Sequence, residues 1–378
     1  MVAATPSIGR FFATLPDPRR ETKNKRHMLL DILVIALCAT VAGCTSAVEI
    51  AEYGRQKESW FRRVLTLAGG IPSHDTFTRV LAALDPERFN ECFVSWVQSL
   101  HELTVGEVVA IDGKTLRRSF DRVEGLKSLH VVTAWAADNR LVLGEVAVDE
   151  KSNEITAIPR LLALLDVSGA IVTIDAMGCQ KEIVEKIREA DADYVLAVKD
   201  NQPNLHADII AHFEHYLDDC DALPRGEFFR TQEVNRGRVE ERCYYSTPVP
   251  AELRGRDEWR DLTSVGMVVS STVRDGKDTS DVRYYISSVK ASARKLCKAS
   301  REHWGTENSQ HWVLDVVFQE DQCRARSGHE PENLAILRRL ALNMLRNETT
   351  KMPSLKVKGH AAGWNDDLMH RILYGKRS

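Results

Sequence analysis

Apolar residues recur at helical spacing through the first hundred positions of the chain. Residues 27–65 and 89–103 carry apolar side chains three or four positions apart, which is the pattern of amphipathic helices. Between them, Ser73 or Asp75 is a candidate N-cap for a helix over residues 73–84. Asp85 should end that helix, because a residue that precedes a proline is driven out of the helical conformation. The pattern predicts an all-helical N-terminal region.

The pattern changes at Val105, where short runs rich in β-branched residues begin. Three such runs follow one another between turn signals, which indicates a meander of antiparallel strands. Helical and strand patterns then alternate, so that the whole predicts a mixed α/β sheet with flanking helices. The expected strands are residues 107–112, 130–136, 141–148, 170–175 and 194–198, and the expected helices are residues 157–165 and 181–190.

After Asp200 the alternation lapses, and a second group of strand patterns follows. We interpret this group as a β-rich insertion over about residues 225–290, with a turn predicted at residues 274–277. Long helices are predicted over about residues 291–316 and over residues 332–346. The strands expected within the insertion are residues 228–231, 239–245, 264–273 and 283–289.

These patterns divide the chain into three expected parts. Residues 1–104 form a helical domain that is a candidate for DNA binding, and residues 105–346 form the α/β domain that contains the insertion. Residues 347–378 are basic and weakly patterned, and we expect them to form a tail. The basic arm at residues 1–28 is expected to be a solvated segment, with phosphate contact as the alternative.

Composition indicates an ordinary globular protein. Of the 378 residues 43% are hydrophobic and 28% charged, which excludes a disordered or fibrous protein. A formal charge of -3 provides no overall attraction to nucleic acid, so any polyanion site must come from local clustering. Eight scattered cysteines without a CxxC motif indicate neither a disulfide framework nor a zinc module. The longest apolar run, residues 32–44, is too short for a membrane span, and we expect a cytoplasmic protein.

Two of the predicted strands end in an aspartate. Asp112 closes the segment VVAID, and Asp175 closes the segment IVTID. The carboxyl ends of strands are where α/β sheets place their sites, so the two carboxylates converge if these strands are neighbours. Carboxylates held close together raise each other's pKa unless a cation lies between them, and a divalent ion with oxygen ligands would meet that need. Taken singly, such an aspartate is more often a turn or cap residue.

The predicted helix over residues 291–316 is the best source of a third acid. His303, Glu307, His311 and Asp315 are spaced by four residues and share one helix face, which a purely structural helix would line with apolar groups. A zinc site is the other interpretation, but the HExxH and cysteine spacings of the usual zinc sites are absent. Glu307 is the central acid of this face, whereas Asp315 is also compatible with an ion-pair or cap role.

Ten short segments, in one order from about residue 10 to residue 346, match a pattern shared with a known family. They are FFATLPDPRR, IPSHDTFTRVLAALDPERF, VVAIDGKTLRRS, LHVVTAW, KSNEITAIPRLL, TIDAMGCQKEI, YVLAVKDNQP, RYYISS, HWGTENSQHWVLDVVFQED and NLAILRRLALN. In these segments the sequence resembles the DDE transposases of bacterial insertion sequences, in the group of the H-repeat-associated proteins. The resemblance implies an RNase H-like catalytic core with a β-rich insertion before the last catalytic helix.

The same resemblance implies a site and an activity. It places the catalytic and metal-binding acids at Asp112, Asp175 and Glu307, with two Mg2+ ions that Mn2+ can replace. It implies cleavage of the ends of a mobile element and strand transfer into target DNA. The partners would be double-stranded DNA, as terminal inverted repeats and target, and a second copy of the chain. The protein would then be associated with the bacterial nucleoid.

The region around the last acid departs from the pattern of related transposases. These often carry a Tyr-x2-Arg-x3-Glu-x6-Lys signature, whereas the matching positions here hold Ser300, His303, Glu307 and Leu314. The departure leaves open the role of His303 and the consequence of the missing lysine.

Cations and aromatic side chains near the acids are candidates for DNA contacts. Cations would hold phosphates, and Trp304 or Trp312 would stack on an unpaired base. The helix over residues 73–84 has the length of a recognition helix. Solvated surface charge and, for the tryptophans, burial in the core are the competing interpretations. The DNA-binding candidates are Arg79, Lys114, Arg117, Arg118, Lys199, His303, Trp304, Arg324 and Arg326.

Three functions are compatible with these observations. The first is an active transposase, the second a DNA-binding descendant that kept the fold and lost transposition, and the third a metal-dependent nuclease or phosphatase without strand transfer. The three intact acids favour the first.

Overall fold

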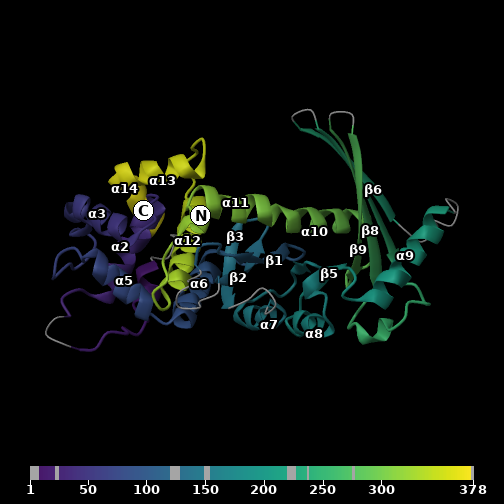
Figure 1. Ribbon diagram of the computed structural model, residues 1–378, viewed down its shortest axis with the longest axis horizontal. Coiled ribbons are helices and arrows are strands. Elements are labelled where there is room, and N and C mark those ends of the chain that lie inside the picture. Colours follow the sequence, from purple (N-terminus) through teal and green to yellow (C-terminus); the bar gives the residue numbers. More distant parts are fainter. Residues whose placement is uncertain are drawn as a thin grey trace.

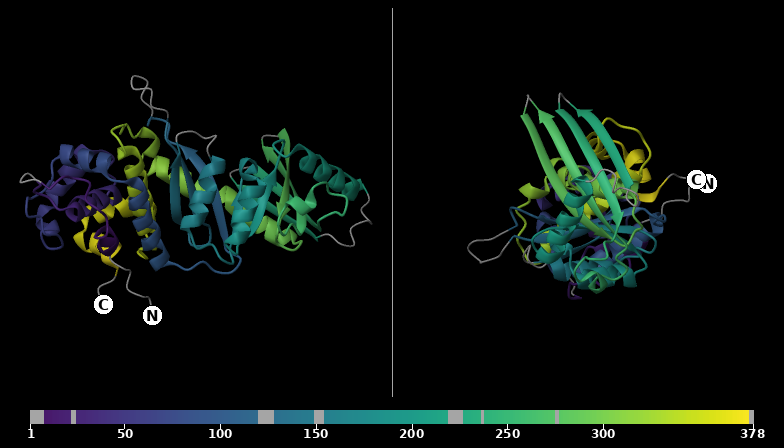
Figure 2. Two further views of the ribbon diagram at one scale, coloured as in Figure 1. Left: turned by 90° about the horizontal axis from the view of Figure 1, so that it is seen from below. Right: turned by 90° about the vertical axis from the view of Figure 1, so that its right-hand side faces the viewer.

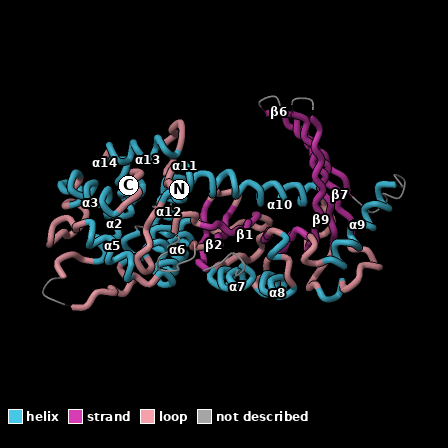
Figure 3. Tube along the Cα trace, viewed as in Figure 1, coloured by secondary structure: helices cyan, strands magenta, loops and turns pink. Residues whose placement is uncertain are grey.

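A nine-stranded mixed sheet runs through the part of the chain that the computed structural model describes, in the order β3-β2-β1-β4-β5-β9-β8-β7-β6. Helices gather at one end of the elongated molecule and the longest strands at the other (Figures 1 and 3). The described residues are 8–21, 25–119, 128–148, 154–218, 227–235, 238–274 and 277–375.

The first five strands of the chain form the centre of the sheet. β1 pairs antiparallel with β2, and β2 with β3, whereas β4 and β5 run parallel to β1. This order and these directions are those of an RNase H-like sheet, which confirms the predicted fold class. The strands are β1 (Val108–Thr115), β2 (His130–Ala136), β3 (Leu141–Val148), β4 (Ile171–Ile174) and β5 (Asp193–Val198).

Helices cover both faces of this central sheet, which explains why its strands are apolar on both sides. All seven residues of β2 are buried. α7 (Glu154–Leu164) and α8 (Lys181–Glu189) lie below the sheet, and α10 (Ala293–Thr306) crosses it on the other side (Figure 1).

The helical region is built around α2 (Leu29–Val41), in which every residue except Leu30 is buried. The expected Ser73 cap is present, because its side chain accepts from the Thr76 amide before α5, and the Asp85 side chain caps the next helix, a role that was not predicted. The other helices that precede the sheet are α1 (Ile8–Phe12), α3 (Ala47–Gln56), α4 (Glu58–Phe61), α5 (His74–Ala83) and α6 (Pro86–Leu100).

The expectation of a C-terminal tail is wrong. α12 (Glu330–Asn347) and α13 (Leu355–Trp364) both pack against α2, and α14 (Asp366–Tyr374) packs against α12 and α13. The pattern was weak because α13 buries mainly small residues, Gly359 and Ala362 among them. Both ends of the described chain therefore belong to the same helical end of the molecule (Figure 2).

The predicted insertion strands continue the central sheet. β9 pairs antiparallel with β5, and β8, β7 and β6 follow as antiparallel neighbours that project from the body as a twisted blade (Figure 2). Part of the predicted turn at residues 274–277 lies outside the described residues. The strands are β6 (Glu227–Asn235), β7 (Arg238–Pro248), β8 (Ser264–Arg274) and β9 (Lys277–Ser287).

One helix was missed where the alternation was said to lapse. α9 (Pro203–Asp218) follows β5 and packs against β9. Its buried apolar side chains, Leu205, Ile209 and Phe213, form a narrow stripe of one residue per turn. So narrow a stripe falls short of the broad apolar face that makes an amphipathic helix easy to recognise. None of the described helices is both long and apolar enough to cross a membrane.

Candidate active site

The first two predicted acids come from neighbouring parallel strands. Ile111 of β1 pairs with Ile174 of β4, and the residues that follow them are Asp112 and Asp175. The two strands are therefore neighbours, which is the condition for the two carboxylates to lie close together. The Asp112 Oδ1 atom accepts from the Gly113 amide at 2.9 Å. The Asp175 side chain caps a short 3-10 turn, so the expected cap role and a place at the site coexist in this residue.

The third acid lies where the helix that crosses the sheet, α10, changes its geometry. α10 continues through a π-helical segment, Glu307–His311, into α11 (Trp312–Val316). π-Helical turns inside α-helices are frequent at functional sites. The His311 Nδ1 atom lies 3.0 Å from Glu307 Oε2 and 3.7 Å from Asp112 Oδ2. One possible ligand atom from each of these three residues lies within 4.8 Å of the others.

All three predicted acids line one cavity of about 470 Å3. Sequence analysis did not anticipate that His311 lies against Asp112 or that Arg283 of β9 lines the cavity. The four-residue spacing from Glu307 pointed to His311, whereas no local pattern marked Arg283. Besides the acids, the cavity is lined by Thr173, Ile174, Ala176, Val195, Ala197, Lys199, Arg283, Tyr285, Ala299, Ser300, His303 and Trp304.

Burial dominates the electrostatics of the cavity. It raises the pKa of Asp112, an effect that His311 and His303 oppose and Asp175 reinforces. Burial lowers the pKa of His303, although Asp112 and Asp175 act in the other direction. The His303 Nδ1 atom lies 3.2 Å from the Thr173 hydroxyl on β4. His303, at the position where related proteins have an arginine, is thus anchored to the sheet between the two aspartates.

These residues fit a divalent cation. The Asp112 carboxylate is disfavoured as an anion by its burial and by Asp175, and a cation between the carboxylates would offset both costs. Carboxylate oxygens are the ligands that hard divalent ions prefer. The buried Nε2 atom of His311 has no hydrogen-bond partner among the described residues.

The structure contradicts the prediction that Lys114 binds DNA. Its side chain is buried, and its Nζ atom lies 2.5 Å from Asp315, 3.2 Å from Glu320 and 3.2 Å from Asp321. A phosphate would have to displace these carboxylates, and three unpaired acids would repel it. The expected ion-pair role of Asp315 is confirmed.

Apart from His303, which is largely buried in the cavity, the other predicted DNA contacts are exposed. Trp304 and Trp312 are 52% and 57% exposed, so burial in the core is excluded for both. The Arg283 guanidinium lies 4.2 Å from the centre of the Trp304 ring. The exposed cations, whose contact with DNA stays a prediction, are Arg79, Arg117, Arg118, Lys199, Arg324 and Arg326.

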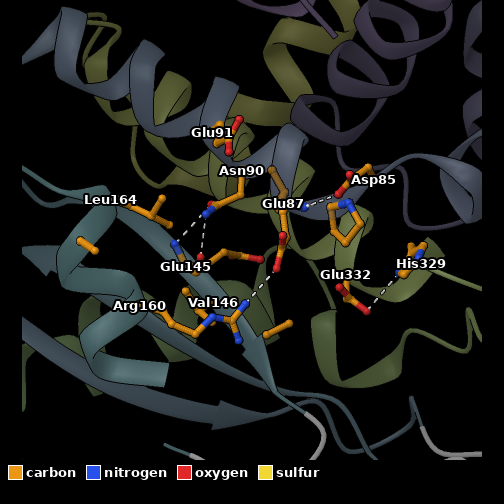
Figure 4. Close-up of a pocket in the computed structure, with 14 residues that line it drawn as sticks. Asp85, Glu87, Asn90, Glu91, Glu145, Val146, Arg160, Leu164, His329 and Glu332 are labelled. Atoms are coloured by element: carbon orange, nitrogen blue, oxygen red, sulfur yellow. Dashed lines mark hydrogen bonds and ion pairs between the residues drawn. The ribbon is translucent and has the colours of Figure 1, made fainter. Parts of the chain in front are cut away.

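A second cavity, of about 620 Å3, lies between the helical region and the sheet (Figure 4). Five of its residues are acids, among them Glu87, Glu91 and Glu145, whereas Arg160 is the one arginine or lysine in its lining. Glu87 and Arg160 form an ion pair at 2.9 Å across it. This charge is unsuited to a polyanion, and the cavity holds none of the three predicted acids.

Gly113, directly after Asp112, is a position where the strand tolerates no side chain. A Cβ atom there would lie 2.4 Å from both Glu154 Oε1 and His130 Nε2, which form a buried pair at 2.6 Å. We expect Gly113→Ala to lower the free energy of unfolding by about 1–3 kcal/mol, measured by urea denaturation. Gly305→Ala is the control, because a Cβ atom there meets open space on a helix and should stabilise by about 0.5–1 kcal/mol. Equal stability of Gly113→Ala and the parent protein would show that the strand can adjust.

Comparison with known proteins agrees with this geometry. The family model described as "Transposase DDE domain" matches residues 104–344, and the model described as "DDE_Tnp_1-associated" matches residues 10–97. The chain is 40% identical over 371 residues to "Putative transposase YncI" of Escherichia coli O157:H7, covering 97% of this chain and 94% of that protein. It is 38% identical over 366 residues to "H repeat-associated putative transposase YhhI" of Escherichia coli (strain K12), covering 96% of each.

Among solved structures, a piggyBac transposase synaptic complex with hairpin DNA matches with a TM-score of 0.44 and 12% identity, over 97% of this chain and 80% of that one. That likeness is too weak to inform on the site. The family models and the similar bacterial proteins are sufficient to identify the family without this structure. The chain belongs to the DDE transposases, in the group of the H-repeat-associated proteins.

Proposed function

We propose that this protein is an active transposase that cleaves the ends of its element and joins them to target DNA in a metal-dependent reaction. One observation supports this most directly. Acids from β1, from the end of β4 and from the π-helical segment after α10 line the same cavity, as cleavage at a metal centre requires.

We assign Asp112, Asp175 and Glu307 as the residues that would hold two Mg2+ ions, with Mn2+ as a substitute. When bound, such ions activate a water molecule and stabilise the charge that develops on the leaving oxygen. Glu307 is 65% exposed, and its contact with His311 restricts a carboxylate that would otherwise rotate freely. His311 thereby orients Glu307 toward Asp112.

The proposed reaction has two chemically similar steps. Water first cleaves a phosphodiester bond at the end of the element and leaves a free 3'-hydroxyl. That hydroxyl then attacks a phosphorus atom of the target strand, which releases a target 3'-oxygen. Both steps are in-line displacements at phosphorus, so one cavity serves for each in turn and no covalent bond to the protein is needed.

Other residues of the cavity lining suit the DNA backbone and a base. Lys199 and Arg283 bring positive charge to it, and Trp304 offers an exposed ring that Arg283 backs. We propose that the cations position the phosphate and that the ring stacks on an unpaired base. Because two element ends must be joined, we propose that a homodimer acts on paired inverted repeats.

The test uses the full-length protein with labelled duplexes that carry the element's ends, a target plasmid, and Mg2+ or Mn2+. We expect nicked ends that become joined to the plasmid, and no product in the presence of EDTA. Binding without nicking would instead indicate a catalytically silent DNA-binding descendant. Nicking that never leads to joined strands would indicate a nuclease.

A further inference from the structure

β1, which carries Asp112, and the helix that carries Glu307 and His311 are joined by a second contact beside the cavity. Asp112 lies on β1, and Lys114 is two residues further along the same strand, so both side chains point to the same face. Asp315 lies on α11, four residues after His311 and therefore on the same helix face. The Lys114–Asp315 ion pair thus joins β1 to the helix, as the contact between Asp112 and His311 does. It lies two residues further along the strand and four residues further along the helix.

The ion pair is anchored on the side away from the cavity. Lys114 also contacts Glu320, and Glu320 Oε1 accepts from the Arg339 guanidinium of α12 at 2.8 Å. Arg339 is fully buried and lies 2.5 Å from Glu145 of β3. Lys114 is therefore held by groups from the centre of the molecule, and its position on the strand is fixed.

The helix that carries Glu307 depends on such an anchor. Glu307 itself is largely exposed, and the π-helical segment interrupts the regular α-helical hydrogen bonding at this point. Besides the Lys114–Asp315 pair on α11, polar contacts also join the π-helical segment to the sheet. The Gln310 side chain donates to Thr133 of β2 at 2.8 Å, and the His311 Nδ1 atom lies 3.7 Å from Asp112 Oδ2. Thr133 lies opposite Asp112 in the register of the two strands.

We propose that Lys114 is a positioning residue for the metal site, holding the helix of Glu307 and His311 in register with Asp112 through Asp315. The proposal rests on the proposed function, because it concerns the same acids. It also accounts for the missing signature lysine. The matching position, Leu314 of α11, is buried and apolar, and the cation that contacts α11 is Lys114 of β1 instead.

The test measures Mn2+ binding to the protein without DNA by titration calorimetry. We expect Lys114→Met and Asp315→Ala each to weaken Mn2+ binding by about 10–100-fold, the range typical of residues that orient metal ligands. Lys114→Arg should recover most of the affinity, because it restores the positive charge. Asp315→Ala leaves Lys114 paired with Glu320 and Asp321, so this variant keeps the test decisive if Lys114→Met does not fold.

Asp321→Ala is the matched control. It also removes one carboxylate from Lys114, but Asp321 lies beyond α11, so Mn2+ binding should stay within about two-fold of the parent protein. A merely structural role for Lys114 would lower thermal stability in all these variants and leave Mn2+ affinity unchanged, which would overturn the proposal. A role in binding phosphate would instead reduce by about 1 the slope of log affinity for DNA against log salt.

The two proposals fail in different ways. If the parent protein neither binds Mn2+ nor cleaves DNA, the proposed function is wrong. If the parent protein binds Mn2+ and cleaves DNA, and Asp315→Ala binds Mn2+ as tightly as the parent protein, only the positioning role of Lys114 is wrong.

Discussion

Replacing Asp112 with asparagine is expected to reduce strand cleavage by at least about 100-fold while DNA binding is retained. The substitution removes a proposed anionic metal ligand at almost no change in volume, and loss of a ligand should cost more than the 10–100-fold typical of the groups that support ligands. The assay is single-turnover cleavage of a labelled element end in Mg2+ and in Mn2+, with binding measured in parallel by gel shift.

The same substitution should not reduce the stability of the metal-free protein. Burial raises the pKa of Asp112, so its ionised form is disfavoured in the folded state and asparagine removes that cost. Adding Mn2+ should raise the melting temperature of the parent protein and leave that of Asp112→Asn unchanged, because a ligand stabilises only the state that binds it.

Asp166→Asn is the control for both measurements, since Asp166 is an exposed aspartate that lies outside the lining of the cavity. It should cleave and respond to Mn2+ as the parent protein does. Cleavage by Asp112→Asn within ten-fold of the parent rate would remove Asp112 from the proposed metal site.

Replacing Arg339 with methionine is expected to lower the free energy of unfolding by about 3–5 kcal/mol. The Arg339 side chain is fully buried between Glu145 and Glu320, at 2.5 and 2.8 Å. Removing it leaves two carboxylates in the interior without their main partner, and an uncompensated buried charge is costly. The measurement is urea denaturation at pH 7, followed by circular dichroism.

This effect should depend on pH in a defined direction. Burial alone would raise the pKa of Glu320, but Arg339 and Lys114 lower it to about 2. A carboxyl group whose pKa is lowered on folding stabilises the protein above its ordinary pKa, 4.5, and that stabilisation is lost as the pH falls toward 2. The part of the difference between the parent protein and Arg339→Met that Glu320 contributes should therefore be full at pH 7 and shrink below about pH 4.5.

An exposed ion pair provides the comparison. Arg55 and Glu52 pair on α3 with both side chains about half exposed, so Arg55→Met should cost less than about 1 kcal/mol. A loss as small as this for Arg339→Met would mean that water or another cation replaces the guanidinium.

Much of the fold could be predicted because its signals are local. Strand patterns rich in β-branched or aromatic residues marked the strands, Ser73 marked a helix start by the hydrogen bond that its side chain offers, and Asp85 marked a helix end because a proline follows it. α9 and the two C-terminal helices escaped prediction. α9 and α13 bury few or small side chains and are stabilised by packing against β9 and α2, whereas α14 has an apolar face that was not recognised and packs against α12 and α13.

The sequence by itself determined most of the elements, the three candidate acids and the family resemblance, because hydrophobic periodicity and an acid that follows an apolar run are properties of short segments. Only the tertiary structure decided which side chains meet. Asp112, Asp175 and Glu307 share a cavity because β1 and β4 pair and α10 crosses them. Lys114 points into three carboxylates more than 200 residues away, and no local pattern could distinguish it from a cation that faces DNA.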